Sequence, residues 1–248
     1  MINKNKKKQR LIIIIPARLN SKRLNQKLLR KINGIPMIVR VAKVAIQTKL
    51  GEVYVASDSK KITNLCDTHK INSLITSSKL KSGTDRVYEA YKKINKNYDL
   101  IINLQGDLPI FDESLLKKIV DLFGDSKTDI GSAICDLTES EREDKNIVKA
   151  YVNLDKKKQG FAVDFFRQYK RRIEIYHHIG IYVYKPSILK RFVDIDQTKN
   201  EKLRSLEQMR ALDNNMRIKL IKVENNPPSV DTLDDLKKIR LLFKGKKY

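Results

Sequence analysis

The chain has 248 residues, of which 41% are hydrophobic and 33% charged, and its formal net charge at pH 7 is +23. The length fits a single α/β domain, and the apolar content excludes wholesale disorder. The 9 glycines and 6 prolines are too few for a collagen-like or low-complexity chain. The two cysteines, Cys66 and Cys135, lie far apart, which excludes a disulfide scaffold and a cysteine-based zinc site.

Short apolar runs alternate with segments of helical spacing in the first half of the chain. Residues 11–15 form a continuous apolar run that ends at Pro16, which is typical of a strand buried on both faces. Residues 36–47 then carry apolar side chains at helical spacing. Further strands are predicted at residues 53–56, 73–76 and 100–104, and further helices at residues 59–69, 84–95 and 113–123. This alternation predicts an α/β fold with a Rossmann-like, mostly parallel sheet and helices on both faces.

The alternation ends near Asp129. Strands without helices between them are predicted at residues 130–135, 148–153 and 179–184, followed by helices at 186–192 and 203–213, a strand at 217–223 and a helix at 233–243. The pattern predicts a mixed-strand insertion over about residues 130–215. We expect one domain over residues 11–243, between basic tails at residues 1–10 and 244–248.

The net positive charge has two interpretations. A balance this basic can indicate a nucleic acid, an anionic membrane or a polyanionic substrate as partner. The lysines are dispersed through the predicted helices, and no basic segment is interleaved with aromatic residues. We therefore interpret the excess as background charge on solvated faces and expect no nucleic-acid partner. A basic nucleic-acid-binding protein is the alternative from another functional class.

The longest apolar run, residues 11–15, is far shorter than the ~20 residues that a membrane-spanning helix needs. It is also too short for the core of a signal peptide, and Arg18 and Arg23 soon follow it. We therefore expect no membrane insertion and a cytoplasmic protein.

Polar segments follow three of the predicted strands, where ligands bind in a doubly wound sheet. Arg18, Arg23 and Lys27 lie on the loop after the first strand, and fixed cations there suit a polyphosphate. The alternative is an exposed basic loop on a basic protein. Asp107 follows the strand at 100–104, and Asp231 lies at a strand-to-helix junction. Two such carboxylates suit Mg²⁺ if they converge at the sheet edge, although each alone could be a turn or helix-cap residue.

Several familiar signatures are absent. The chain has no G-x-G-x-x-G, no G-x-x-x-x-G-K-[ST], no H-E-x-x-H and no G-x-S-x-G, which disfavours dinucleotide redox chemistry and P-loop hydrolysis. His177 and His178 are adjacent, so in a strand they would point to opposite faces, and we expect at most one of them to face the site.

The order of six segments resembles the 3-deoxy-manno-octulosonate cytidylyltransferase family, from about Leu11 to Leu241. These segments are IIPAR-x4-R-x3-K, SGTDR, NLQGD-x-P, H-x-GIY, LEQ-x-R and VDT-x-DDL. The resemblance implies a nucleotide-diphospho-sugar transferase fold and a nucleotidyltransferase that moves CMP from CTP to the anomeric hydroxyl of 3-deoxy-manno-octulosonate (Kdo). Pyrophosphate is released, and the activated sugar serves lipopolysaccharide synthesis. The family also implies Mg²⁺ and a homodimer built through the insertion.

The resemblance also implies roles for residues of this chain. The catalytic residues would be Arg18, Lys27, Asp107 and Asp231, with Mg²⁺ held by the two aspartates. The nucleotide would be bound by Pro16, Ala17, Arg18, Arg23, Lys27, Ser82, Gly83, Thr84 and Arg86. The sugar acid would be bound by Gln105, Arg167, His178, Glu207 and Gln208.

The chain departs from the family pattern at several positions. The loop that usually reads RLPGKPL is RLNQKLL over residues 23–29, so both prolines are lost and a less rigid loop is expected. Leu108 replaces a usual Glu, and Phe166 replaces a usual Ser. Three alternatives therefore remain: Kdo, a related sugar acid such as the 8-amino analogue or a sialic-acid-like sugar, and a non-catalytic homologue.

Overall fold

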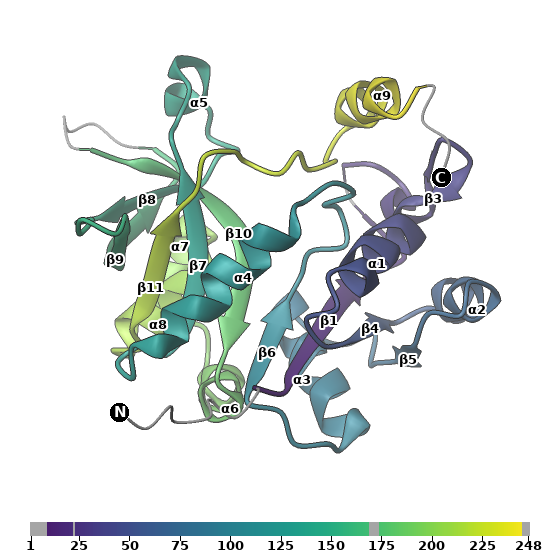
Figure 1. The fold of residues 1–248 in the computed structure, drawn as a ribbon, viewed down its shortest axis with the longest axis horizontal. Coiled ribbons are helices and arrows are strands. Elements are labelled where there is room, and N and C mark those ends of the chain that lie inside the picture. The colour runs from purple at the N-terminus through teal and green to yellow at the C-terminus, as the bar shows by residue number, and fades with distance from the viewer. Residues whose placement is uncertain (1–8, 22, 169–173, 245–248) are drawn as a thin grey trace, which may run out of the picture.

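The computed structural model describes residues 9–21, 23–168 and 174–244, so most of the two predicted basic tails lies outside the described residues. Within these residues the strands form a nine-stranded sheet and a separate two-stranded sheet (Figure 1). The strands are β1 (Leu11–Ala17), β2 (Lys31–Ile32), β3 (Ile35–Pro36), β4 (Glu52–Ser57), β5 (Ser73–Ile75), β6 (Leu100–Asn103), β7 (Ile130–Cys135), β8 (Lys149–Val152), β9 (Gln159–Phe166), β10 (Tyr176–Tyr184) and β11 (Ile218–Lys222).

Helices separate most of the strands of the first half and follow β10 in the second. They are α1 (Met37–Gln47), α2 (Lys60–Thr68), α3 (Gly83–Ile94), α4 (Glu113–Asp121), α5 (Glu139–Glu143), α6 (Pro186–Asp194), α7 (Lys199–Arg204), α8 (Gln208–Asp213) and α9 (Leu233–Leu242), with 3-10 turns η1 (Lys27–Leu29) and η2 (Leu122–Gly124). Among the described residues, no helix is long and apolar enough to cross a membrane.

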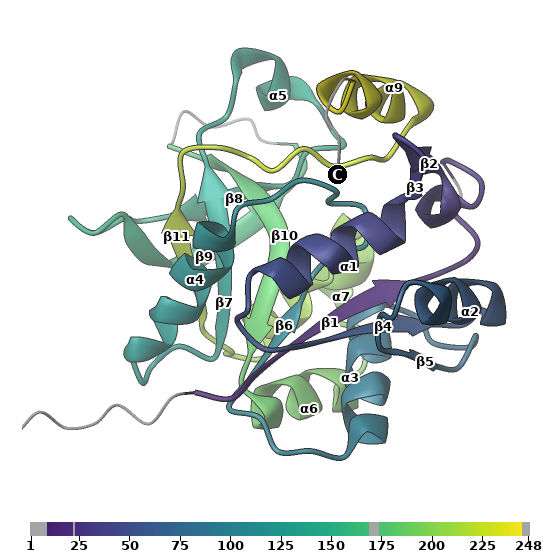
Figure 2. The ribbon, with the colours of Figure 1, turned by 45° about the vertical axis from the view of Figure 1, so that its right-hand side comes forward.

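Alternate residues of β1 belong to two different cores, because successive side chains of a strand point to opposite faces. Ile13 and Ile15 pack in a cluster with buried residues of α1, α2 and α4. Ile12 and Ile14 pack in a second cluster with α3, α6 and α8. Helices therefore cover both faces of the sheet, as the apolar run at residues 11–15 predicts (Figure 2).

The sheet is mixed, which corrects the prediction of a mostly parallel sheet. Its order is β5-β4-β1-β6-β10-β7-β11-β9-β8. The first four strands are parallel, as predicted. β10 then runs antiparallel between β6 and β7, and β9 runs antiparallel between β11 and β8. A further antiparallel pairing of β8 with β10 closes β10, β7, β11, β9 and β8 into a ring.

Several local features differ from the sequence-based expectations. β1 continues through Pro16 to Ala17, because its pairing with β6 stops at Ile14 and the proline has a strand neighbour on the β4 side only. β9 was not predicted, since its residues are mostly half-exposed and form no buried apolar run. The helix expected over residues 203–213 is two helices, α7 and α8, because Ser205 adopts a left-handed backbone with φ of 52°.

The segment over residues 223–232, called the strap below, connects β11 to α9 across the molecule (Figure 1). The backbone N–H of Val230 in this strap donates a hydrogen bond of 3.0 Å to the carbonyl of Asp107, which follows β6. This bond ties the strap to the carboxyl end of the parallel strands, where ligands bind in open α/β sheets.

Candidate functional site

One cavity of about 370 Å³ brings seven of the predicted site residues together. Its walls come from the loop after β6, from β10, from the break between α7 and α8, and from the strap. All five residues expected to bind the sugar acid and both expected metal ligands line it: Gln105, Arg167, His178, Glu207, Gln208, Asp107 and Asp231. Gln105 and Asp231, which are 126 positions apart in the sequence, thus line the same cavity.

The carboxylates of Asp107 and Asp231 converge on the ammonium group of Lys27. Nζ of Lys27 lies 2.7 Å from Oδ2 of Asp107 and 2.9 Å from Oδ1 of Asp231. Burial alone would lower the pKa of Lys27, but the charges and hydrogen bonds of the two carboxylates outweigh it and raise this pKa. Lys27 is therefore charged at neutral pH and neutralises part of the acidic wall.

Arg23 and Arg18, the other two cations predicted to act from the loop after β1, make different contacts. Arg23 is exposed, and its Nη2 lies 2.8 Å from Oδ1 of Asp231. Arg18 instead donates a hydrogen bond of 3.3 Å to the carbonyl of Leu80, in the segment that leads into α3. The loop therefore presents its positive charge between the aspartates and the start of α3.

The residues expected to bind the nucleotide at the start of α3 are partly structural. Ser82 caps the helix and accepts from the N–H of Asp85, and a Cβ placed on Gly83 would lie 3.6 Å from Pro16. Thr84 and Ala17 are buried in the protein interior. This close packing places the segments around Pro16 and Gly83 side by side, as a shared nucleotide site would require.

Arg86 is fully buried and has no contact with solvent. Its guanidinium donates to Asp58, 3.1 Å away, and to the hydroxyl of Thr76. Burial lowers the pKa of Arg86, and the charge of Asp58 partly offsets this effect. Arg86 therefore fixes α3 to the ends of β4 and β5, and its expected contact with the nucleotide stays a prediction.

His178 is a neutral residue of the cavity wall. Burial lowers its pKa to about 3, and neighbouring His177 adds to the effect. Its Nε2 lies 3.0 Å from Oγ of Ser132, and this hydroxyl also lies 2.8 Å from the carbonyl of Ile181, which can only accept. Since the hydroxyl donates its hydrogen to the carbonyl, Nε2 of His178 carries the ring proton and Nδ1 is an acceptor.

Glu207 lines the same cavity and carries an unpaired oxygen. Its Oε1 is buried and has no hydrogen-bond partner among the described residues. Burial raises the pKa of Glu207, and the hydroxyls of Ser82 and Thr84 beside it counteract this only in part. A buried acceptor without a partner costs free energy, so Glu207 is suited to accept a ligand hydroxyl.

Arg167 lies at the edge of the cavity, immediately after β9. Its Nη1 donates to the backbone carbonyl of Asn146, 2.9 Å away, which holds the guanidinium near the α5–β8 connection. Phe166 is buried and lines a different cavity, which it shares with Arg167. The departure at Phe166 therefore does not line the cavity that holds the predicted sugar-acid residues.

Both neighbouring histidines line the cavity, which corrects the expectation that at most one would. His177 accepts from Nδ2 of Asn226 in the strap at 3.2 Å, and its Nδ1 lies 2.9 Å from Oε1 of Glu141 in α5. The alternation of side chains along β10 holds, but α5 and the strap, which also line the cavity, fold over the His177 face of the strand.

Sequence reasoning also missed Asp58 and Tyr182. Asp58 follows β4 and accepts from the N–H of Leu19 at 3.2 Å as well as from Arg86, so it links the loop after β1 to α3. The rule that singled out Asp107, a carboxylate directly after a strand, applies equally to Asp58. Tyr182 lines the cavity, with its ring centroid 5.4 Å from that of His178, and it lies within the H-x-GIY segment that was recognised for the histidine.

The two converging carboxylates fit a hard divalent cation. They already surround one cationic group, and carboxylate oxygens are the ligands that Mg²⁺ prefers. No cluster of three or more His, Cys, Asp or Glu side chains suited to a metal occurs in the part of the chain that the structure describes. This suits a cation bound by one or two carboxylates plus substrate phosphates and water better than an all-protein cage.

Comparison with known proteins agrees with this geometry. A family model described as cytidylyltransferase matches residues 12–218. The 3-deoxy-manno-octulosonate cytidylyltransferase of Paramagnetospirillum magneticum is 37% identical, over 94% of this chain and 98% of its own length. The enzyme of the same name from Rickettsia rickettsii is 40% identical, over 92% of this chain and 95% of its own length.

A solved structure extends the likeness to three dimensions. It is a CMP:2-keto-3-deoxy-manno-octonic acid synthetase in complex with CTP, with a TM-score of 0.86 and 29% identity, over 94% of this chain and 98% of that chain. Together with the sequence matches, this likeness places the chain in the cytidylyltransferase family and, within it, among the 3-deoxy-manno-octulosonate cytidylyltransferases.

Proposed function

We propose that this chain transfers CMP from CTP to the anomeric hydroxyl of Kdo, releasing pyrophosphate and activating the sugar for lipopolysaccharide synthesis. The observation that carries the proposal is the single cavity in which Asp107 and Asp231 stand beside Glu207, Gln208 and His178. The carboxylates expected to hold a metal ion at the phosphates and the residues suited to bind sugar hydroxyl groups therefore line one cavity. The homologous enzymes named above support the same reaction.

On the nucleotide side, the chain supplies positive charge and orientation. The sugar oxygen attacks the α-phosphorus of CTP as the bond to the β-phosphate breaks, so negative charge accumulates on the departing pyrophosphate. Lys27 and Arg18 would bind this leaving group, and fixed cations act in such a displacement mainly by positioning and charge stabilisation. Mg²⁺, held by Asp107 and Asp231, would supply further charge neutralisation at the phosphates.

On the sugar side, the chain supplies a cation and several hydrogen-bonding groups. Arg167 is the candidate for the sugar carboxylate, because a guanidinium binds a carboxylate with two parallel hydrogen bonds. A neutral His178 cannot provide that charge, but its Nδ1 can accept a hydrogen bond from a hydroxyl group. Glu207 and Gln208 would bind hydroxyl groups along the sugar chain.

The eight-carbon acid is the substrate we propose over its relatives. A site built to hydrogen-bond hydroxyl groups discriminates strongly, since a poorly fitting sugar leaves buried polar groups such as Glu207 unpaired. The test compares kcat/KM for Kdo, its 8-amino analogue and N-acetylneuraminate in one CTP-dependent assay of pyrophosphate release. Preference for either alternative by tenfold or more would refute the sugar assignment and leave cytidylyl transfer standing.

We also propose a homodimer, following the family resemblance. The insertion after Asp129 exposes large apolar side chains, with Val163 on β9 52% exposed and Leu203 on α7 78% exposed. Burial of such side chains favours association. Sedimentation should give twice the chain mass of 28.8 kDa, and replacing both residues with Asp should shift the protein towards the monomer.

A further inference from the structure

The turn that presents Lys27 to Asp107 and Asp231 has an unfavourable backbone conformation. Gln26, which precedes Lys27, has φ of 50° and ψ of 39°. This is the left-handed region, which residues other than glycine seldom adopt because Cβ crowds the backbone. The carbonyl of Gln26 accepts from the N–H of Leu29 at 2.9 Å and closes η1. The direction in which Lys27 leaves the loop therefore depends on a strained residue.

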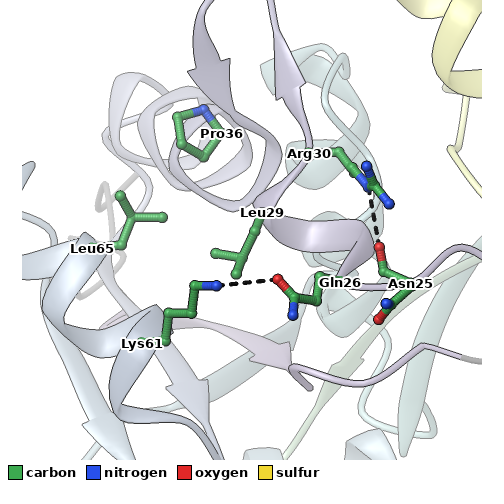
Figure 3. Close-up of a pocket in the computed structure, with 7 residues that line it drawn as sticks. All are labelled: Asn25, Gln26, Leu29, Arg30, Pro36, Lys61 and Leu65. Atoms are coloured by element: carbon green, nitrogen blue, oxygen red, sulfur yellow. Dashed lines mark hydrogen bonds between the residues drawn. The ribbon is translucent and has the colours of Figure 1, made fainter.

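A lysine from another element contacts this strained residue. Nζ of Lys61, on α2, donates a hydrogen bond of 3.2 Å to Oε1 of Gln26. Figure 3 shows the two side chains extended towards each other beside Leu29, at a cavity of about 520 Å³ between the loop and α2. The backbone of this exposed lysine is held in place, because Ser59 caps α2 and accepts from the N–H of Lys61 at 3.2 Å.

The remaining contacts of the turn hold its backbone from within. Nε of Arg30 donates to the carbonyl of Asn25 at 3.1 Å, and Leu24 and Leu28 are buried. Neither contact involves the Gln26 side chain. Lys61 thus adds a link between the turn and the helix at the edge of the sheet, at the position where the family pattern described above has glycine and a proline before it.

We propose that Lys61 is a positioning residue that acts through Gln26. By holding the Gln26 side chain, it stabilises the left-handed turn and so keeps Lys27 directed at Asp107 and Asp231. Lys61 does not line the cavity that contains these aspartates, so it acts on the site through the turn alone. The inference rests on the proposed function, in which Lys27 binds the triphosphate of CTP.

A double-mutant cycle tests this kinetically. Lys61→Met and Gln26→Ala should each lower kcat/KM for CTP by about 3- to 10-fold, the range expected for loss of one hydrogen bond. The double variant should be no worse than either single variant, KM for the sugar acid should be unchanged, and Lys61→Arg should restore most of the loss. Lys60→Met removes a neighbouring exposed charge and should match wild type. Additive losses, or an equal loss in Lys60→Met, would overturn the proposal.

Amide hydrogen exchange of the substrate-free protein separates this proposal from the proposed function. Lys61→Met should speed exchange of the Leu29 and Arg30 amides, which close the turn, by about 3- to 10-fold. Exchange at α9 and β1 should stay as in wild type. Unchanged exchange at the turn would refute the proposed role of the Lys61–Gln26 hydrogen bond, even in an active enzyme. Faster exchange in a chain that releases no pyrophosphate with any sugar acid would support the role of this hydrogen bond and refute the proposed function.

Discussion

The ammonium group of Lys27 lies 2.7 Å from Oδ2 of Asp107. The same group lies 2.9 Å from Asp231, and the Lys27 side chain is only 12% exposed. A protein cation thus occupies the point on which the two carboxylates converge. A divalent cation bound to both carboxylates would be repelled by this ammonium group at short range. Metal binding and the movement of Lys27 towards the triphosphate should therefore be coupled.

Removing this ammonium group should strengthen metal binding in the absence of nucleotide. We expect Lys27→Met to bind Mn²⁺ alone about tenfold or more tightly than wild type, because the competing charge is gone. Free Mn²⁺ can be measured by electron paramagnetic resonance. Lys43→Met, at an exposed position of α1, is the control for a general change of one charge. Equal or weaker Mn²⁺ binding by Lys27→Met would show that Lys27 does not compete for the carboxylates.

The two aspartates should each be needed for turnover. Asp107→Asn and Asp231→Asn should lower the rate of pyrophosphate release by about 10²-fold or more, as loss of a preorganised charged group does. A chelator should abolish the wild-type activity. Asp234→Asn changes an exposed aspartate three positions from Asp231 and should leave the rate close to wild type. Full activity of either site variant, or of wild type in chelator, would be incompatible with the metal role.

His178 should stay uncharged throughout the physiological pH range. Its folded-state pKa of about 3 is below its unfolded value near 6.5, so the unfolded chain binds more protons between these values. The stability associated with neutral His178 is therefore complete above pH 6.5 and falls as the pH drops, by up to about 1.4 kcal/mol per pH unit. Nuclear magnetic resonance of labelled histidine should show no titration of His178 near pH 6.5, and His178→Gln should flatten the decline of Tm below that pH. A midpoint near 6.5 would contradict the buried, neutral ring.

Ionised Glu207 should lower the free energy of unfolding at alkaline pH. Burial raises its pKa above the unfolded value, so the folded state binds more protons in the interval between the two pKa values, and stability falls as the pH rises through it. Glu207→Gln should raise Tm at pH 8 by about 2–4 °C for each kcal/mol recovered, with a smaller gain at pH 5. It should also raise KM for the sugar acid with little change in KM for CTP. A lower Tm at pH 8 would indicate that the carboxylate is stabilising in the substrate-free chain.

The sequence predicts the parallel half of the fold well, since each strand there is a compact apolar run followed by a helix. Residues 11–15 show this most clearly, because five consecutive buried positions require cover on both faces. The direction of β10 and the existence of β9 were not predictable in the same way. Pairing with distant strands determines them, and the half-exposed residues of β9 show no periodic apolar pattern.

The site was predictable to the extent that its residues follow strands. Asp107 was found by that rule, and the resemblance supplied the residues on the sugar side. The pairing of Lys27 with both aspartates joins positions 80 and 204 residues apart, so it depends on the topology that brings the strap beside β6. The buried ion pair of Arg86 with Asp58 was missed for the same reason.

The most direct test of the account is product analysis from purified chain with equimolar CTP and Kdo in the presence of Mg²⁺. The account predicts one pyrophosphate and one CMP-linked sugar acid for each CTP consumed, and no pyrophosphate when the sugar is omitted. Pyrophosphate release that does not depend on a sugar acid, or no release with any member of the sugar panel, would contradict it.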